Sequence, residues 1–184
     1  FLEELCRYHI SGQLKVAPEH VSANVLKVMR KAPKEVTTKF ISDFRNMNIK
    51  LGMKQFLVPY FMSAHPGSTL KDALELAEYI RDTGLRPEQV QDFTPTPGSI
   101  STCIYHTGID PMTGEKVYVP KSFEERKMQR ALLQYWMPEN AELVRRALEE
   151  LGRTDLIGNT SHCLVQQSRN YTKKVNKQDE EVSE

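Results

Sequence analysis

Three short strand-like runs in this sequence each end in groups that could bind a ligand. Glu19 follows the first run, the turn 65–68 follows the second, and Thr94 closes the third. A carboxylate accepts hydrogen bonds from hydroxyl and amino groups, and the free amides at a helix start point outward toward a ligand. Ligands of α/β proteins bind at such strand-to-helix junctions, so these residues are candidates for one site.

The clearest junction is Gln55–Ile80. An apolar run, Phe56 to Met62, precedes a polar turn, and apolar residues then recur at helical spacing. This change of period predicts strand, turn and helix. Pro66 biases the residue before it toward an extended backbone, and Gly67 permits a left-handed one. Ser68 or Thr69 is expected to cap the helix through its hydroxyl.

The same alternation of strand and helix patterns recurs on both sides of this junction. Strands are predicted at Gln13–Pro18 and Val90–Thr94, and helices over residues 22–29 and 35–51. Alternating helices and strands predict an α/β fold with a parallel sheet. Three strands cannot close a barrel, so more strands are expected upstream. The chain begins with Phe1 rather than Met, which also suggests a piece of a longer protein.

The pattern changes after Ile100. We predict barrel-like units over residues 1–100, an appended hairpin and helical domain over 101–165, and a disordered tail over 166–184. The appended part is expected to contain a β-hairpin, with Ser101–His106 and Lys116–Val119 flanking a turn-rich loop. Helices are predicted from Ser122 or Phe123 to Tyr135 and over Ala141–Leu151.

The composition argues against several functional classes of protein. A net charge of +1 argues against a general nucleic-acid or membrane-surface role, and no apolar run is long enough to cross a bilayer. The cysteines, Cys6, Cys103 and Cys163, form neither a disulfide framework nor a CxxC metal site. We therefore expect a cytoplasmic protein. Cys103 is expected to be a buried, unreactive thiol, and the charged helical faces after residue 120 to be ion-paired.

Three segments resemble successive strand ends of radical S-adenosylmethionine (SAM) enzymes. These are PEHVSANVLKVM after the first predicted strand, HPGST after the second and TPTPGS after the third. GQLKVAPEH, VPYFMSAHPGSTL and VYVPKSFEERKMQRALLQY extend the resemblance to the YgiQ group of that family. It covers residues 1–163. In that group a domain of unassigned function follows the barrel.

The resemblance implies the last three units of a partial (β/α)6 barrel, a 4Fe–4S cluster, and reductive cleavage of SAM to a radical. It also implies the cofactor-binding residues. These are Lys15, Glu19, His20, His65, Pro66, Gly67, Ser68, Asp92 and Thr94. For Lys15, Glu19, His20 and residues 65–68 a structural role remains open: a Lys–Glu pair, a capping or surface histidine, or a tight turn. Either Gln91 or Asp92 is expected to face the cavity.

One departure limits the expected activity. The family holds its cluster with a CxxxCxxC loop after the first strand, and this sequence has none. We expect that motif in an upstream part of the protein, and the present chain alone to be inactive. A second hypothesis is a non-catalytic module whose appended helices recruit a protein or RNA partner.

Overall fold

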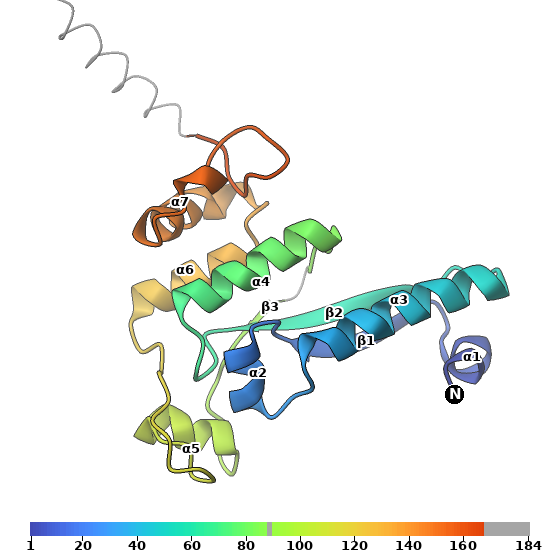
Figure 1. The fold of residues 1–184 in the computed structure, drawn as a ribbon, viewed down its shortest axis with the longest axis horizontal. Helices are drawn as coiled ribbons and strands as arrows, with labels where there is room; N and C mark the ends of the chain where they lie inside the picture. Colours follow the sequence, from blue (N-terminus) through green and yellow to red (C-terminus); the bar gives the residue numbers. More distant parts are fainter. Residues whose placement is uncertain (88–89, 168–184) are drawn as a thin grey trace, which may run out of the picture.

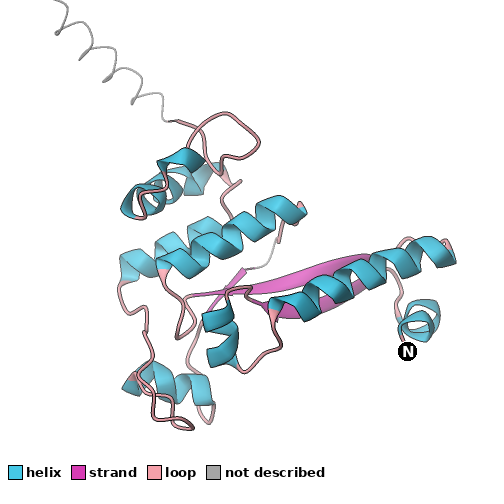
Figure 2. Cartoon of the chain, viewed as in Figure 1, coloured by secondary structure: helices cyan, strands magenta, loops and turns pink. Residues whose placement is uncertain are grey.

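A sheet of three parallel strands organises the chain, as the sequence predicts for an α/β protein. The computed structural model describes residues 1–87 and 90–167. The strands lie in the order β1 (Gln13–Glu19), β2 (Phe56–Ser63), β3 (Val90–Asp92). The α-helices are α1 (Leu2–Glu4), α2 (Ala23–Met29), α3 (Lys34–Leu51), α4 (Leu70–Thr83), α5 (Ile100–Thr107), α6 (Phe123–Leu133) and α7 (Ala141–Glu150), with short helical turns at Leu5–His9, Pro138–Asn140 and Thr154–Leu156. Figure 2 shows the strands side by side.

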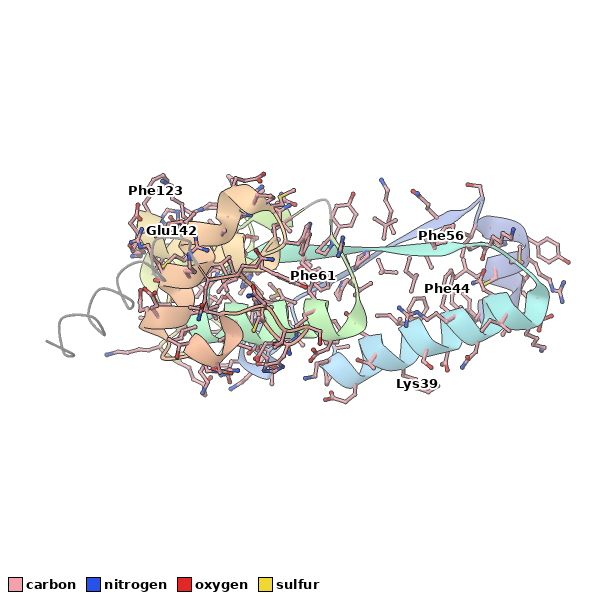
Figure 3. All side chains as sticks on the ribbon, turned by 90° about the horizontal axis from the view of Figure 1, so that it is seen from above. Lys39, Phe44, Phe56, Phe61, Phe123 and Glu142 are labelled. Carbon is pink, nitrogen blue, oxygen red and sulfur yellow. The ribbon has the colours of Figure 1, made fainter. Side chains whose placement is uncertain are left out.

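The long helix α3 covers one face of β1 and β2. Leu14 and Leu57 are register partners on neighbouring strands, and both pack against the cluster that contains Phe44 of α3. Figure 3 shows Phe44 pointing from α3 toward the strands, whereas Lys39 points away. The alternation expected of strand side chains is therefore present, with Leu14 turned toward the helix and Lys15 exposed on the other face.

A larger core lies over the other end of β2. Phe61 packs there with the apolar faces of α4, α6 and α7, and Leu132 and Leu148 are fully buried in it. Figure 1 shows α6 beside α4, although these helices lie far apart in the sequence. Helices that follow residue 100 are thus packed into the same core as the helix of the second βα unit.

The predicted hairpin is wrong in its first half. Residues 100–107 form α5, because Ser99 caps a helix by accepting a hydrogen bond from the Thr102 amide at 3.2 Å. Gly108 ends that helix with a φ of 69°. The turn that follows is present, closed by an antiparallel bridge between Ile109 and Lys116. The sequence reading missed the capping serine and took a short helix for a strand.

Two further sequence predictions concern the end of the chain. The predicted tail, 166–184, lies outside the described residues except for Gln166 and Gln167. The ion-paired helical face is confirmed for Arg146, whose Nη1 lies 3.3 Å from Glu124 Oε2, and for Arg145, 3.0 Å from Glu142 Oε2. Among the helices that the structure describes, none has the length and apolar character to cross a membrane.

Candidate functional site

A cavity of about 260 Å³ lies at the carboxyl ends of the strands. Residues from all three strand ends line it, together with the first turn of α5. They are Glu19, Met29, Met62, His65, Gln91, Phe93, Thr94, Thr96, Ser99 and Ser101. Three of the predicted site residues, Glu19, His65 and Thr94, are therefore brought together. Ligand pockets usually enclose roughly 300–1,000 Å³, so these residues form part of a wall rather than a complete pocket.

The backbone is strained where β1 reaches the cavity. Glu19 has a φ of 63°, and the His20 amide donates to the Pro18 carbonyl across it at 2.8 Å, which forms a γ-turn. A non-glycine residue in such a conformation costs about 1–3 kcal/mol and is held by its surroundings. Here Lys31 supplies the support. Its ammonium group donates to the Ala17 carbonyl at 2.8 Å and lies 3.3 Å from Glu19 Oε1.

The end of β2 is strained in the same way. Ala64 has a φ of 56° and is almost fully buried. Its amide donates to the side-chain oxygen of Gln129, on α6, at 3.1 Å. Two neighbouring strands thus end in left-handed, non-glycine residues at one edge of the sheet. Such residues cluster at binding and catalytic sites. Glu19 lines the cavity, and Ala64 directly precedes His65, which also lines it.

His65 is buried but reaches the cavity wall. Its Nδ1 lies 2.7 Å from the Pro66 carbonyl, and its Nε2 lies 2.9 Å from Ser101 Oγ. A carbonyl can only accept, so Nδ1 carries the proton and Nε2 accepts from Ser101. The edge of the imidazole meets Phe93, with 5.0 Å between ring centroids. Burial lowers the pKa of His65, which keeps the ring neutral at physiological pH.

His20 does not line the cavity. Its side chain is only 2 % exposed, and its Nδ1 accepts a hydrogen bond from the Ser22 amide at 3.0 Å. Burial lowers the pKa of His20 to about 4, against a smaller opposing effect of Asp72 and a further lowering by His65. His20 is therefore a neutral, buried histidine at the start of the β1–α2 loop.

The amides of the β2–α4 turn are used within the chain. The Gly67 amide donates to the Tyr118 carbonyl at 2.7 Å, and the Ser68 amide to the His65 carbonyl at 2.9 Å. Ser68 is fully buried, and its hydroxyl donates to Gln129 Oε1 at 2.8 Å. Thr69, rather than Ser68, caps α4 in a reciprocal arrangement with Asp72. Pro66 is buried as well. The contacts of residues 66–68 therefore fit the structural alternative, a tight turn, that the sequence left open.

Replacing Gly67 by alanine is expected to destabilise the chain by about 2 kcal/mol, since its φ is 91° and an added Cβ would lie 3.0 Å from Val28 Cγ2. Gly52 offers a matched control, because its φ is 63° and nothing lies within 4 Å of the added atom. Gly52→Ala should cost about 1 kcal/mol, the conformational part alone. Chemical denaturation of both variants measures the difference, and equal losses would exclude a steric role for Val28.

Lys15 and Asp92 lie outside the cavity lining. Lys15 is exposed on the face of β1 turned away from α3. The Asp92 carboxylate accepts a hydrogen bond from Ser63 Oγ and lies 3.1 Å from Arg130 Nη1. Of the two polar residues on β3, Gln91 is the one that lines the cavity. Asp92 instead ties β3 to β2 and α6.

The described residues offer no cluster-binding set. They contain no group of three or more His, Cys, Asp or Glu residues that could hold a metal ion. The three cysteines are free thiols on separate segments. Cys6 is buried, and burial raises its pKa. Cys103, expected to be buried, is exposed, because residues 100–107 form a helix and place it on the outer face.

Sequence reasoning missed three residues that shape this site: Lys31, Ser101 and Gln129. Lys31 follows α2 without a marked pattern. Ser101 lay inside the predicted strand, so its position at a helix start was not considered. Gln129 did give a signal, since it is a polar residue within the apolar face that Met128 and Leu132 define on α6. A glutamine on a core-facing stripe indicates a buried hydrogen-bond network.

These features define an α/β protein with a cavity at the carboxyl ends of its parallel strands. Residues 88–183 match the family described as a domain of unknown function, DUF3362. A UPF0313 protein from Methanocella arvoryzae is 58% identical over 169 residues, which cover 92% of this chain and 28% of that protein. UPF0313 proteins of Clostridium botulinum strain 657 and Methanosarcina mazei are 57% and 54% identical, over 90% and 94% of this chain and 26% and 28% of their own lengths.

The chain belongs to the UPF0313 family and carries its DUF3362 domain. It spans about a quarter of the length of the relatives named above, since their matched shares are 26–28%.

Proposed function

We propose that this chain is the C-terminal part of a radical SAM enzyme and supplies three βα units of its partial barrel. The observation that carries the proposal is the cavity at the carboxyl ends of three parallel strands, lined by residues of every strand end. Barrel enzymes bind their ligands at that end of the strands. The order of the three motifs along the chain and the two strained strand ends support it further.

The residues that line the cavity suit one side of a SAM molecule. The Glu19 carboxylate accepts hydrogen bonds from hydroxyl or amino groups, and the Thr94 hydroxyl both donates and accepts. Met62 and Phe93 supply apolar surface beside them. SAM, when bound and given one electron by the cluster, would supply the 5′-deoxyadenosyl group as the radical and methionine as the leaving group. The chain's own residues orient it and exclude water from one side.

A 4Fe–4S cluster does not fit this chain. Its cysteines lie on separate segments, and the part of the chain that the structure describes has no metal-binding group. Three thiolates must come close together to hold a cubane cluster. We therefore expect another part of the protein to hold the cluster.

Binding of SAM to the full-length protein tests the proposal. Glu19→Gln is expected to weaken SAM binding roughly tenfold, because a charge-assisted hydrogen bond contributes about 1.5–3 kcal/mol. Glu139→Gln is the matched control, since it makes the same exchange at an exposed position in the turn before α7. Equilibrium dialysis gives the affinities, and reductive release of 5′-deoxyadenosine reports cleavage.

Two outcomes would contradict the proposal. If full-length protein reconstituted with iron and sulfide neither binds nor cleaves SAM, the result favours a non-catalytic module instead. Equal SAM affinities of the Glu19→Gln and Glu139→Gln variants would show that Glu19 does not contribute to SAM binding.

A further inference from the structure

The domain of unknown function contributes much of the cavity wall. Six of the ten lining residues fall within the matched range 88–183. They are Gln91, Phe93, Thr94, Thr96, Ser99 and Ser101. The remaining lining residues come from the two preceding units. The cavity is therefore shared between the first two βα units and the matched domain, which includes β3.

The same domain reaches the strained end of β2 through a single side chain. Gln129 of α6 is fully buried. Its Oε1 accepts from the Ala64 amide at 3.1 Å and from the Ser68 hydroxyl at 2.8 Å. Its Nε2 donates to the Ser68 carbonyl at 2.9 Å and to Glu125 Oε1 at 3.1 Å. All four hydrogen-bonding positions of the amide are thus satisfied, which fixes its orientation.

A second chain of contacts supports the same turn. Tyr118 accepts from the Gly67 amide through its carbonyl at 2.7 Å, and its hydroxyl donates to Glu125 Oε2 at 2.5 Å. Glu125 also accepts from Gln129. The turn between β2 and α4 is therefore held at Ala64, Gly67 and Ser68, in each case by a group of the matched domain.

His65 lies inside this held segment. Its ring is fixed by Ser101 at 2.9 Å and by the edge contact with Phe93, both of which belong to the matched domain. The left-handed conformation of Ala64 sets the direction in which His65 leaves the strand. If Ala64 relaxed to an extended backbone, the imidazole would turn away from Ser101 and the cavity.

We propose that the DUF3362 domain positions the cavity-facing turn of the preceding βα unit, and that Gln129 is the residue through which it holds His65 in place. Gln129 is a positioning residue in this account, because it contacts the turn and not the cavity. The domain is then a working part of the site rather than a separate module that recruits a partner.

The inference rests on the proposed function only in taking the cavity as the ligand site. The position of His65 can be measured without any ligand. Its protonation at Nδ1 gives a distinct signature in the nuclear magnetic resonance (NMR) spectrum of ¹⁵N-labelled histidine. A merely structural role of Gln129 would change stability and leave that signature alone.

The experiment compares variants of the full-length protein, labelled on histidine. Gln129→Met keeps a side chain of similar length but makes none of the four hydrogen bonds. We expect His65 to pass from the Nδ1-protonated form to a mixture of tautomers, and SAM affinity to fall about tenfold. Val144→Ala, a fully buried site on α7 in the same core, is the control and should change neither signal.

A second variant keeps the test decisive if Gln129→Met fails to fold. Ser101→Ala removes the Nε2 partner of His65, which also belongs to the matched domain, from a partly exposed position. The ¹⁵N signal of Nε2 should shift, while the Pro66 carbonyl still holds the proton on Nδ1. An unchanged His65 spectrum in the folded variants would overturn the inference. A His65 change in protein that never binds SAM would instead uphold the positioning role and contradict the proposed function.

Discussion

Acidification from pH 6.5 to about 4 is expected to remove about 3 kcal/mol of stability through His20 alone. The pKa of this buried imidazole falls from 6.5 to about 4 on folding, and each pH unit of difference corresponds to about 1.4 kcal/mol. The unfolded chain takes up a proton below pH 6.5, whereas the folded chain does not until about pH 4. Stability is therefore full above pH 6.5, is lost as the pH falls, and levels off below pH 4 with respect to this group.

Urea denaturation of the chain across this pH range measures the effect. His20→Gln keeps a polar side chain that cannot titrate, so the slope of stability against pH should become shallower than in the unmodified chain. His106→Gln, at an exposed position on α5, is the control and should leave the slope unchanged. Asp110 and Asp155, whose pKa values are lowered by hydrogen bonds from the Met112 amide and Arg153, titrate at lower pH and cancel in the comparison.

A slope that is the same with and without His20 would show that the pKa of this ring does not change on folding. His65 adds a smaller change of the same sign, because burial also lowers its pKa. The groups that face His20 include Asp72 and His65. The double variant at positions 20 and 65 should therefore show the shallowest slope of the set.

The strands and the helices between them were predictable, because apolar periodicity alone indicates them. Strands at 13–18 and 56–62 and the helices between them follow from apolar spacing and from the glycines that end helices, such as Gly52 and Gly84. The third strand is shorter than predicted and ends at Asp92. The segment 101–106 was misread, because its β-branched and aromatic residues favour a strand while a single capping serine decides for a helix.

The site was predictable only as a region. Strand ends could be located from the sequence, and Glu19, His65 and Thr94 at these ends line the cavity. Which neighbour faces inward depends on register, and a shift of one residue exchanges Asp92 for Gln91. Gln129 and Ser101 act through tertiary contacts more than thirty residues away from His65 along the chain. Such contacts leave no local pattern, so a single sequence cannot reveal them.

Asp72→Ala is expected to destabilise the chain by about 4 kcal/mol, because one buried carboxylate supports two loops. Asp72 Oδ1 accepts from Ser22 Oγ at 2.5 Å, and Oδ2 accepts from the amide and hydroxyl of Thr69. The variant therefore removes the Asp72 half of the capping box of α4, although Thr69 Oγ1 still accepts from the backbone amide of residue 72. It also leaves a buried serine hydroxyl without this partner. Glu75→Ala on the same helix is the control. It loses only an exposed ion pair with Lys34 at 3.7 Å, which is worth about 0–1 kcal/mol.

The effect of Asp72 on the pKa of His20 allows a second, independent measurement of its role. Because Asp72 raises the pKa of His20 against the effect of burial, Asp72→Asn should lower that pKa further and extend the acid-induced loss to lower pH. Thermal unfolding of the three variants and histidine NMR titration of Asp72→Asn measure the two effects. Similar losses of stability for Asp72→Ala and Glu75→Ala would mean that the β1–α2 loop and the β2–α4 turn are held in place independently of one another. The bridge from Ser22 to Asp72 to Thr69 would then not be what keeps Glu19 and His65 on one cavity.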